Sequence, residues 1–274
     1  MIAMSNLAFP SEAIPKSLPL WKAEGLTGIE VAPTRLAPWD ELTPEMLKNY
    51  RRTLEDLGLV VPSLQALLFG KDGVALLGDE ASFERLVEHL RQVAGIAALL
   101  GARIMVFGSP RHRSRGNLPV PEALVLGEER LRRCAEAVHK EAGVALGLEP
   151  VPAAYGGDFL ELAEDVTSMV SAVAHPGLRL HLDTGCVKLG GGDISASVHA
   201  GASWLSHFHA AEPQLGIFAN PVADHVAAAR ALSAIEYAGW ISIEMRQVDD
   251  WETAVPAALR FVRRQYVEGN GQAA

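Results

Sequence analysis

Cysteine is scarce in this 274-residue sequence, and it has neither long apolar runs nor a surplus of basic residues. The two cysteines, Cys134 and Cys186, are too few for a disulfide framework and do not have the spacing of a metal finger. No apolar run approaches the roughly 20 residues that a membrane-spanning helix needs. The first ten residues lack the positive and long apolar regions of a signal peptide. These absences predict a cytoplasmic protein with no membrane partner.

The charge balance is acidic, with 24 Lys and Arg against 33 Asp and Glu and a net charge of −9. Binding to a nucleic-acid backbone needs a basic footprint, so no nucleic-acid partner is predicted. The hydrophobic content of 49% is ordinary for a globular protein with a sizeable core.

Short apolar runs alternate with amphipathic stretches along the whole chain, which is typical of β/α units. The expected strands cover residues 4–8, 28–32, 60–65, 103–108, 144–149, 178–183, 205–209 and 241–244. The expected helices cover residues 11–24, 44–58, 80–100, 120–142, 159–174, 193–203, 222–238 and 251–267. Eight units predict a single (β/α)8 TIM barrel over residues 1–267, with residues 268–274 as a frayed tail. A doubly wound open sheet is the alternative, but it usually has fewer units.

Four of the expected strands end on a side chain that can bind a metal: Glu149, Asp183, His209 and Glu244. An acid at the end of an apolar strand is costly to desolvate and usually has a partner. In a (β/α)8 barrel the strand ends meet at one mouth, so these four side chains are expected to lie together. Two Glu, one Asp and one neutral His suit Mn²⁺, Mg²⁺, Co²⁺ or Fe²⁺ and, less specifically, Zn²⁺. For any one of the four alone, a salt bridge, a helix cap or a buried hydrogen bond is an equally good interpretation.

The motifs around these residues resemble the strand-5 to strand-8 motifs of the xylose-isomerase-like TIM-barrel superfamily. They are Leu148-Glu149-Pro150, Leu182-Asp183-Thr184-Gly185, His207-Phe208-His209 and Ile243-Glu244-Met245. The resemblance implies one divalent metal ion, with Mn²⁺ the best candidate, held by Glu149, Asp183, His209 and Glu244. It also implies that Glu149 and Glu244 act as the catalytic acid/base pair of a sugar or sugar-phosphate isomerase or epimerase. The reaction would move a proton beside a metal-bound carbonyl through an enediolate, on a small-molecule carbohydrate.

Two positions depart from the ketose 3-epimerase branch of that superfamily. Cys186 stands where the branch has a histidine, and Leu215 stands where it has an arginine that binds substrate. A metal-dependent dehydratase or lyase acting on an inosose or keto-sugar therefore stays an alternative, as does a non-catalytic sugar-binding barrel. The endonuclease branch needs more metal ligands than this set supplies. A homo-oligomer is compatible with the sequence, which leaves the oligomeric state open.

Further residues are candidates for substrate binding because they lie near the ends of the expected strands or in the loops after them. They are Glu30, Gln65, Tyr155, Cys186, Lys188 and Glu212. For Glu30 and Gln65, pairing with a lysine or with the backbone is about as good an interpretation. For Tyr155 packing on the barrel rim is the alternative, and for Lys188 a solvated loop position.

An arginine-rich loop follows the fourth expected strand. It includes Arg111 and Arg113 within an otherwise acidic protein. The default interpretation is a solvated surface charge run. Guanidinium groups bind phosphate and carboxylate well, however, so a phosphorylated or acidic sugar is the alternative.

Overall fold

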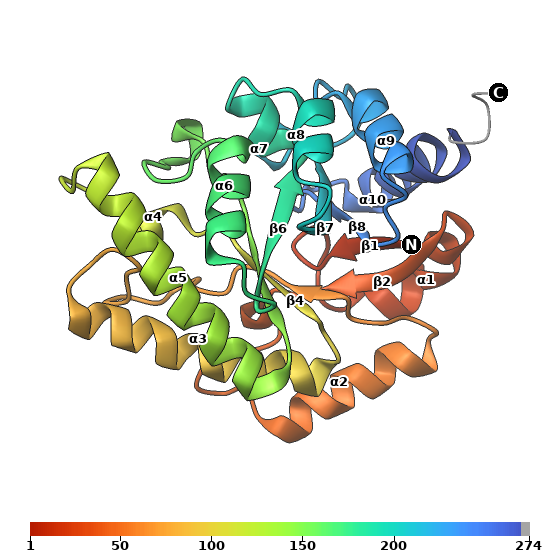
Figure 1. Ribbon diagram of the computed structural model, residues 1–274. Coiled ribbons are helices and arrows are strands. Elements are labelled where there is room, and N and C mark those ends of the chain that lie inside the picture. Colours follow the sequence, from red (N-terminus) through yellow and green to blue (C-terminus); the bar gives the residue numbers. More distant parts are fainter. Residues whose placement is uncertain (270–274) are drawn as a thin grey trace.

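Parallel strands and helices alternate along residues 1–269, the part of the chain that the computed structural model describes (Figure 1). Within that part, eight strands form one sheet. They are β1 (Ile2–Ser5), β2 (Leu26–Glu30), β3 (Ser63–Leu64), β4 (Ile104–Phe107), β5 (Ala145–Leu148), β6 (Leu178–Asp183), β7 (Leu205–Ala211) and β8 (Ile241–Glu244).

The sheet closes into a barrel. Its order is β2-β1-β8-β7-β6-β5-β4-β3, and the pairs between these neighbours are parallel. Parallel bridges from Gly28 to Val60 and from Val31 to Leu64 connect the two edges of that order. The predicted (β/α)8 fold is therefore confirmed.

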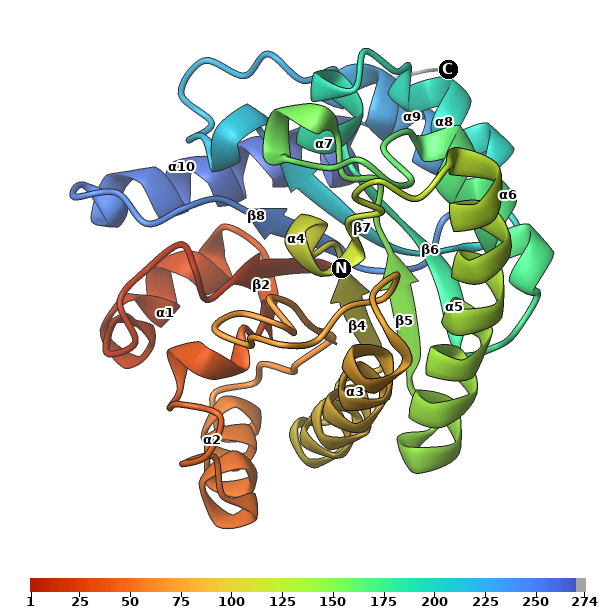
Figure 2. The same cartoon turned by 90° about the vertical axis from the view of Figure 1, so that its left-hand side faces the viewer.

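The long helices lie around the strands, as Figure 2 shows. The α-helices of the described residues are α1 (Ala13–Ala23), α2 (Pro44–Asp56), α3 (Glu80–Leu100), α4 (Pro110–Arg113), α5 (Val120–Ala142), α6 (Ala163–Val173), α7 (Thr184–Leu189), α8 (Ile194–Ala200), α9 (His225–Ala234) and α10 (Trp251–Val262). Four further turns are the 3₁₀ segments η1 (Pro33–Arg35), η2 (Ala153–Tyr155) and η3 (Pro213–Leu215) and the π-helix η4 (Arg263–Glu268). No helix in this part of the chain is long and apolar enough to cross a membrane.

Helix ends follow the capping signals of the sequence. The Thr43 side chain accepts a hydrogen bond of 3.2 Å from the Met46 backbone N–H and caps α2. Gly101 ends α3 with a φ of 87°, a conformation that glycine adopts at little cost. These two boundaries agree with the prediction.

The first two strands begin two residues earlier than predicted, and they end three and two residues earlier, respectively. Beyond β2, the Ala32 N–H donates a 2.8 Å hydrogen bond to the Asn6 side chain. This N–H therefore pairs with a side chain and not with a neighbouring strand. The third strand is also shorter than residues 60–65, since Pro62 has no N–H for a ladder bond. The seventh strand extends two residues beyond His209, to Ala211.

The sequence pattern predicts no helix directly after Asp183, but helix α7 begins there. The Asp183 carboxylate accepts a 2.6 Å hydrogen bond from the Cys186 N–H and caps this helix. Helix α6 begins at Ala163 and not at residue 159 as predicted. Leu160 has a φ of 56°, which is not a helical conformation, so the helix cannot include it. Glu268 of the predicted tail is the last residue of η4, and residues 270–274 lie outside the described part.

Candidate metal centre at the strand ends

Four metal-binding side chains meet where β5, β6, β7 and β8 end. Glu149 follows β5, Asp183 and Glu244 end β6 and β8, and His209 lies in β7. One ligand atom from each of Glu149, Asp183 and His209 lies within 4.8 Å of the others. His209 Nδ1 is 3.6 Å from Asp183 Oδ2 and 3.4 Å from Glu244 Oε2. The barrel thus brings all four predicted residues together.

Burial and mutual repulsion make the three carboxylates an unfavourable group without a counter-charge. Burial raises the pKa of Glu149 well above its ordinary value, and the Asp183 and Glu244 carboxylates raise it further. Burial also raises the pKa of Glu244. Burial opposes the charged form of His209, but Glu30 and Glu244 outweigh it and hold the pKa of His209 well above its ordinary value. One imidazolium cannot balance three acids, so the site favours additional positive charge.

The donor set fits a divalent cation. His209 Nδ1 is buried and has no hydrogen-bond partner among the described residues, although it faces the carboxylates. Carboxylate oxygens with one imidazole nitrogen are ligands that suit Mn²⁺, Mg²⁺, Co²⁺, Fe²⁺ and Zn²⁺. Four protein ligands would leave coordination positions open to a substrate for the six-coordinate ions of this group.

A cavity of about 240 Å³ opens beside these side chains. Its lining residues are Ser109, Pro110, Glu149, Val151, Tyr155, Asp183, Cys186, Leu215 and Glu244. The volume lies just below the roughly 300–1,000 Å³ of most small-molecule pockets. Three acids line it, and none of these lining residues is a lysine or arginine.

The sequence also matches a family model described as "Xylose isomerase-like TIM barrel", over residues 19–265. The chain belongs to this family. Among curated proteins it is similar to an L-ribulose 3-epimerase from Mesorhizobium japonicum, with 27% identity over 194 residues. That alignment covers 70% of this chain and 64% of the relative, so it spans less than two thirds of the relative's length.

Solved structures share the fold of this family member at low identity. A D-psicose 3-epimerase in the presence of D-fructose superposes with a TM-score of 0.81 and 16% identity, covering 97% of this chain and 99% of that one. An L-ribulose 3-epimerase gives a TM-score of 0.78 and 22% identity, covering 99% of this chain and 95% of that one. A probable 3-DHS dehydratase from Bacillus anthracis gives a TM-score of 0.74 and 16% identity, covering 95% of this chain and 98% of that one.

Two of the predicted substrate-binding residues of this family member line the cavity. The Tyr155 hydroxyl accepts a 2.7 Å hydrogen bond from the Gln214 N–H, so the ring holds the loop that carries Leu215. Gln214 and Leu215 have φ angles of 61° and 54°, which is costly for residues with a side chain. Cys186 Sγ lies 3.9 Å from Glu149 Oε1. Leu215 and Cys186 thus stand as uncharged cavity walls.

The predicted cationic residues lie outside the cavity lining. Arg111 is exposed and pairs with Asp72 at 2.8 Å. Arg113 is buried, and its Nη1 donates to the backbone oxygens of Phe107 and Glu149 at 3.2 and 2.9 Å. Burial lowers the pKa of Arg113 to about 10, which leaves it charged at neutral pH. Lys188 is exposed on α7. These cations fix loops or face solvent and give the cavity no anion-binding group.

Three other predicted substrate-binding residues are buried and bonded within the protein. Glu30 is fully buried beneath the site and contacts two histidines. Gln65 donates to the hydroxyl of Ser5. Glu212 bonds His225 at 2.7 Å and accepts from the Val222 N–H at 2.7 Å, so it fastens the loop before α9. None of the three appears among the residues that line the cavity.

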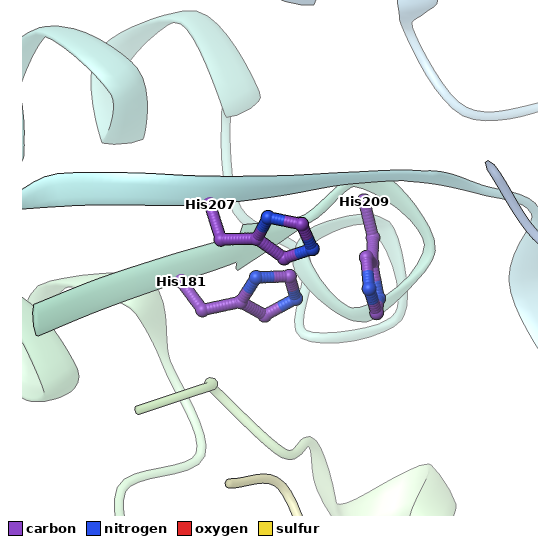
Figure 3. Close-up of side chains that lie close together, drawn as sticks. All are labelled: His181, His207 and His209. Carbon is purple, nitrogen blue, oxygen red and sulfur yellow. The ribbon is translucent and has the colours of Figure 1, made fainter. Parts of the chain in front are cut away.

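His181 and His207 form a deeper layer that the site prediction did not include (Figure 3). Each precedes a predicted ligand by two positions on its strand, so it points into the same interior one layer lower. Their rings stack with centroids 5.3 Å apart. His181 Nε2 lies 3.5 Å from Glu149 Oε1, and neither ring nitrogen of His181 has a hydrogen-bond partner among the described residues. The period of two was the signal that could have found them.

Proposed function

We propose that this chain is a divalent-metal-dependent sugar isomerase or epimerase that moves a proton beside a carbonyl group. The observation that carries the proposal is the meeting of three carboxylates with the unpartnered Nδ1 of His209 at one small cavity. Similarity to an L-ribulose 3-epimerase supports the same class of reaction.

The four strand-end residues would hold the cation: Glu149, Asp183, His209 and Glu244. When bound there, a divalent cation supplies a Lewis acid that polarises a carbonyl group and offsets the negative charge developing on its oxygen. It would also supply positive charge beside the three acids.

Glu149 and Glu244 are the residues that exchange the proton. They come from β5 and β8, with β6 and β7 between them, so they approach the cavity from two sides. One glutamate removes the proton from the carbon beside the carbonyl, and the other returns a proton to the opposite face, which inverts that carbon. Burial raises the pKa of both carboxyl groups, which moves them towards the neutral range where an acid/base group works best.

The substrate class is a neutral sugar of about monosaccharide size. Three acids and no lysine or arginine line the cavity, so its side chains offer a phosphate like charges and no cationic partner. The exposed pairing of Arg111 and the backbone bonds of Arg113 favour the structural interpretation of the arginine loop over a phosphorylated substrate.

The test is solvent-deuterium incorporation. The Mn²⁺-loaded protein is incubated in D₂O with a panel of ketoses, inososes and their phosphates, and proton loss beside the carbonyl is followed by NMR. We expect exchange, with formation of an epimer or isomer, on a neutral ketose and at least about ten-fold less on its phosphate. Glu149→Gln and Glu244→Gln should each lower the exchange rate by about 100-fold or more.

Glu164→Gln, which changes an exposed carboxylate on α6, is the control and should leave the rate unchanged. A dehydratase would instead release water and form an unsaturated product. A binding barrel would retain the sugar without exchange. Either of these results, or full exchange in both glutamine variants with metal retained, would refute the proposal.

A further inference from the structure

A buried polar cluster connects the barrel interior to His209, one of the proposed metal ligands. We call Glu30, Ser63, His207 and His209 the Glu30 cluster. Glu30 Oε2 accepts a 2.6 Å hydrogen bond from the Ser63 hydroxyl and lies 2.7 Å from His207 Nε2. His209 Nε2 lies 2.9 Å from Glu30 Oε1 and 3.0 Å from Oε2, so it faces both oxygens almost equally.

Three members of the cluster, Glu30, Ser63 and His207, are not among the residues that line the cavity. Glu30 and Ser63 are fully buried, and His207 is 1% exposed. Burying a carboxylate is unfavourable unless its oxygens are well bonded. The Glu30 carboxylate bonds two imidazoles and one hydroxyl. These contacts link β2, β3 and β7 inside the barrel.

The two nitrogens of His209 therefore face different chemistry. Nε2 points down to Glu30, whereas Nδ1 points up to Asp183 and Glu244. A histidine that binds a metal through one nitrogen must carry its proton on the other, and the partner of that second nitrogen sets the tautomer and the ring orientation.

We propose that Glu30 is a positioning residue that holds the N–H of His209 on Nε2 and so keeps Nδ1 free and aimed at the cation. This inference rests on the proposed metal site. Ser63 and His207 act one step further away, since they restrain the Glu30 carboxylate through Oε2. The role differs from that of a ligand, because Glu30 does not reach the cavity.

The test measures metal affinity directly, without a substrate. Metal-stripped protein is titrated with Mn²⁺ by calorimetry, and the melting temperature of the stripped protein is recorded. Glu30→Gln keeps the shape of the side chain but removes its charge and one acceptor oxygen. We expect its Kd for Mn²⁺ to rise by about 10–100-fold, as for other partners of metal-binding histidines. The visible spectrum of the Co²⁺ form should also shift, because the basicity and tilt of His209 change.

Glu212→Gln is the matched control. Glu212 is also a buried carboxylate 2.7 Å from a histidine nitrogen, but His225 is not a proposed ligand. We expect both Glu30→Gln and Glu212→Gln to lower the melting temperature. Glu212→Gln should nevertheless keep the Kd for Mn²⁺ within about two-fold of wild type. If Glu30→Gln does not fold, Ser63→Ala replaces it, and a Kd raised by more than about two-fold is then expected.

A folded Glu30→Gln protein with wild-type Kd and Co²⁺ spectrum would overturn the inference while leaving the metal site intact. Failure of the wild type to bind Mn²⁺ would instead remove the proposed function and the inference together. Binding of a second ion per chain that Glu30→Gln abolishes would also overturn the inference, since the deeper group of His181, His207 and His209 would then form a metal site of its own.

Discussion

At the scale of single residues, the site depends on where side chains are missing as well as on where they stand. Glu149 lies over Gly108, at the end of β4, so closely that a Cβ added to Gly108 would be 2.2 Å from Glu149 Oε2. The absence of a side chain at Gly108 is thus part of what lets the Glu149 carboxylate reach the cavity.

Gly108→Ala should therefore damage the site more than the fold. The new methyl group must displace the Glu149 carboxylate, and a displacement of about 1 Å can cost on the order of 100-fold in rate. Gly95→Ala in α3 is the control, because a Cβ there meets no atom within 4 Å and alanine favours a helix by roughly 1 kcal/mol. We expect lost deuterium exchange with Gly108→Ala, and normal exchange with a raised melting temperature with Gly95→Ala. Wild-type exchange in Gly108→Ala would contradict the placement of Glu149.

The same carboxylate should destabilise the metal-free protein at neutral pH. A carboxyl group whose pKa is raised on folding is bound to its proton more tightly in the folded state. Its contribution to stability is present below the ordinary pKa of 4.5 and is lost as the pH rises through the raised pKa.

Removing the metal should then reverse the order of stability between wild type and variant. Without metal at about pH 8, Glu149→Gln should melt at a higher temperature than wild type, and the difference should shrink as the pH falls towards about 4. Saturating Mn²⁺ should raise the melting temperature of the wild type more than that of Glu149→Gln, since the wild type binds the ion more tightly. Differential scanning calorimetry at several pH values measures both effects. A metal-free variant that is less stable than wild type at about pH 8 would disprove this account of the charge.

At the scale of elements, Asp183 connects a strand, a helix and the site. Its Oδ1 caps α7 through the Cys186 N–H, and its Oδ2 faces His209 Nδ1 at 3.6 Å. The sequence pattern predicted β6 and the acid at its end. It did not predict α7, because Gly185 in the first turn signals a turn more strongly than a helix.

Two substitutions separate these roles of Asp183. Asp183→Asn keeps an acceptor oxygen for the cap but loses the charge, whereas Asp183→Ala loses both. Metal binding should fail in both variants. The metal-free alanine variant should also be less stable than the asparagine variant by about 0.5–2 kcal/mol, the usual value of a cap. Equal stability by urea unfolding would show that the cap contributes nothing to α7.

At the scale of the whole molecule, the repeating β/α pattern was enough to predict the barrel and the mouth where distant residues meet. The ends of β6 and β8 were also predictable, because alternating apolar residues stop at an acid there. The features that could not be predicted from the sequence are contacts between side chains and distant strands of the barrel. Glu30 of β2 meets His207 and His209 of β7, and no local pattern reports that contact. The direction of Arg113, into the backbone of two strands, is likewise set by packing that spacing does not encode.

The central claim is that four strand ends build one divalent-metal site, and titration of the stripped wild-type protein with Mn²⁺ tests it most directly. The account predicts one ion per chain, and it predicts that His209→Ala, which removes the only nitrogen ligand of the proposed set, weakens binding by at least about 100-fold. Absence of binding by the wild type, or the same stoichiometry and affinity in His209→Ala, would contradict it.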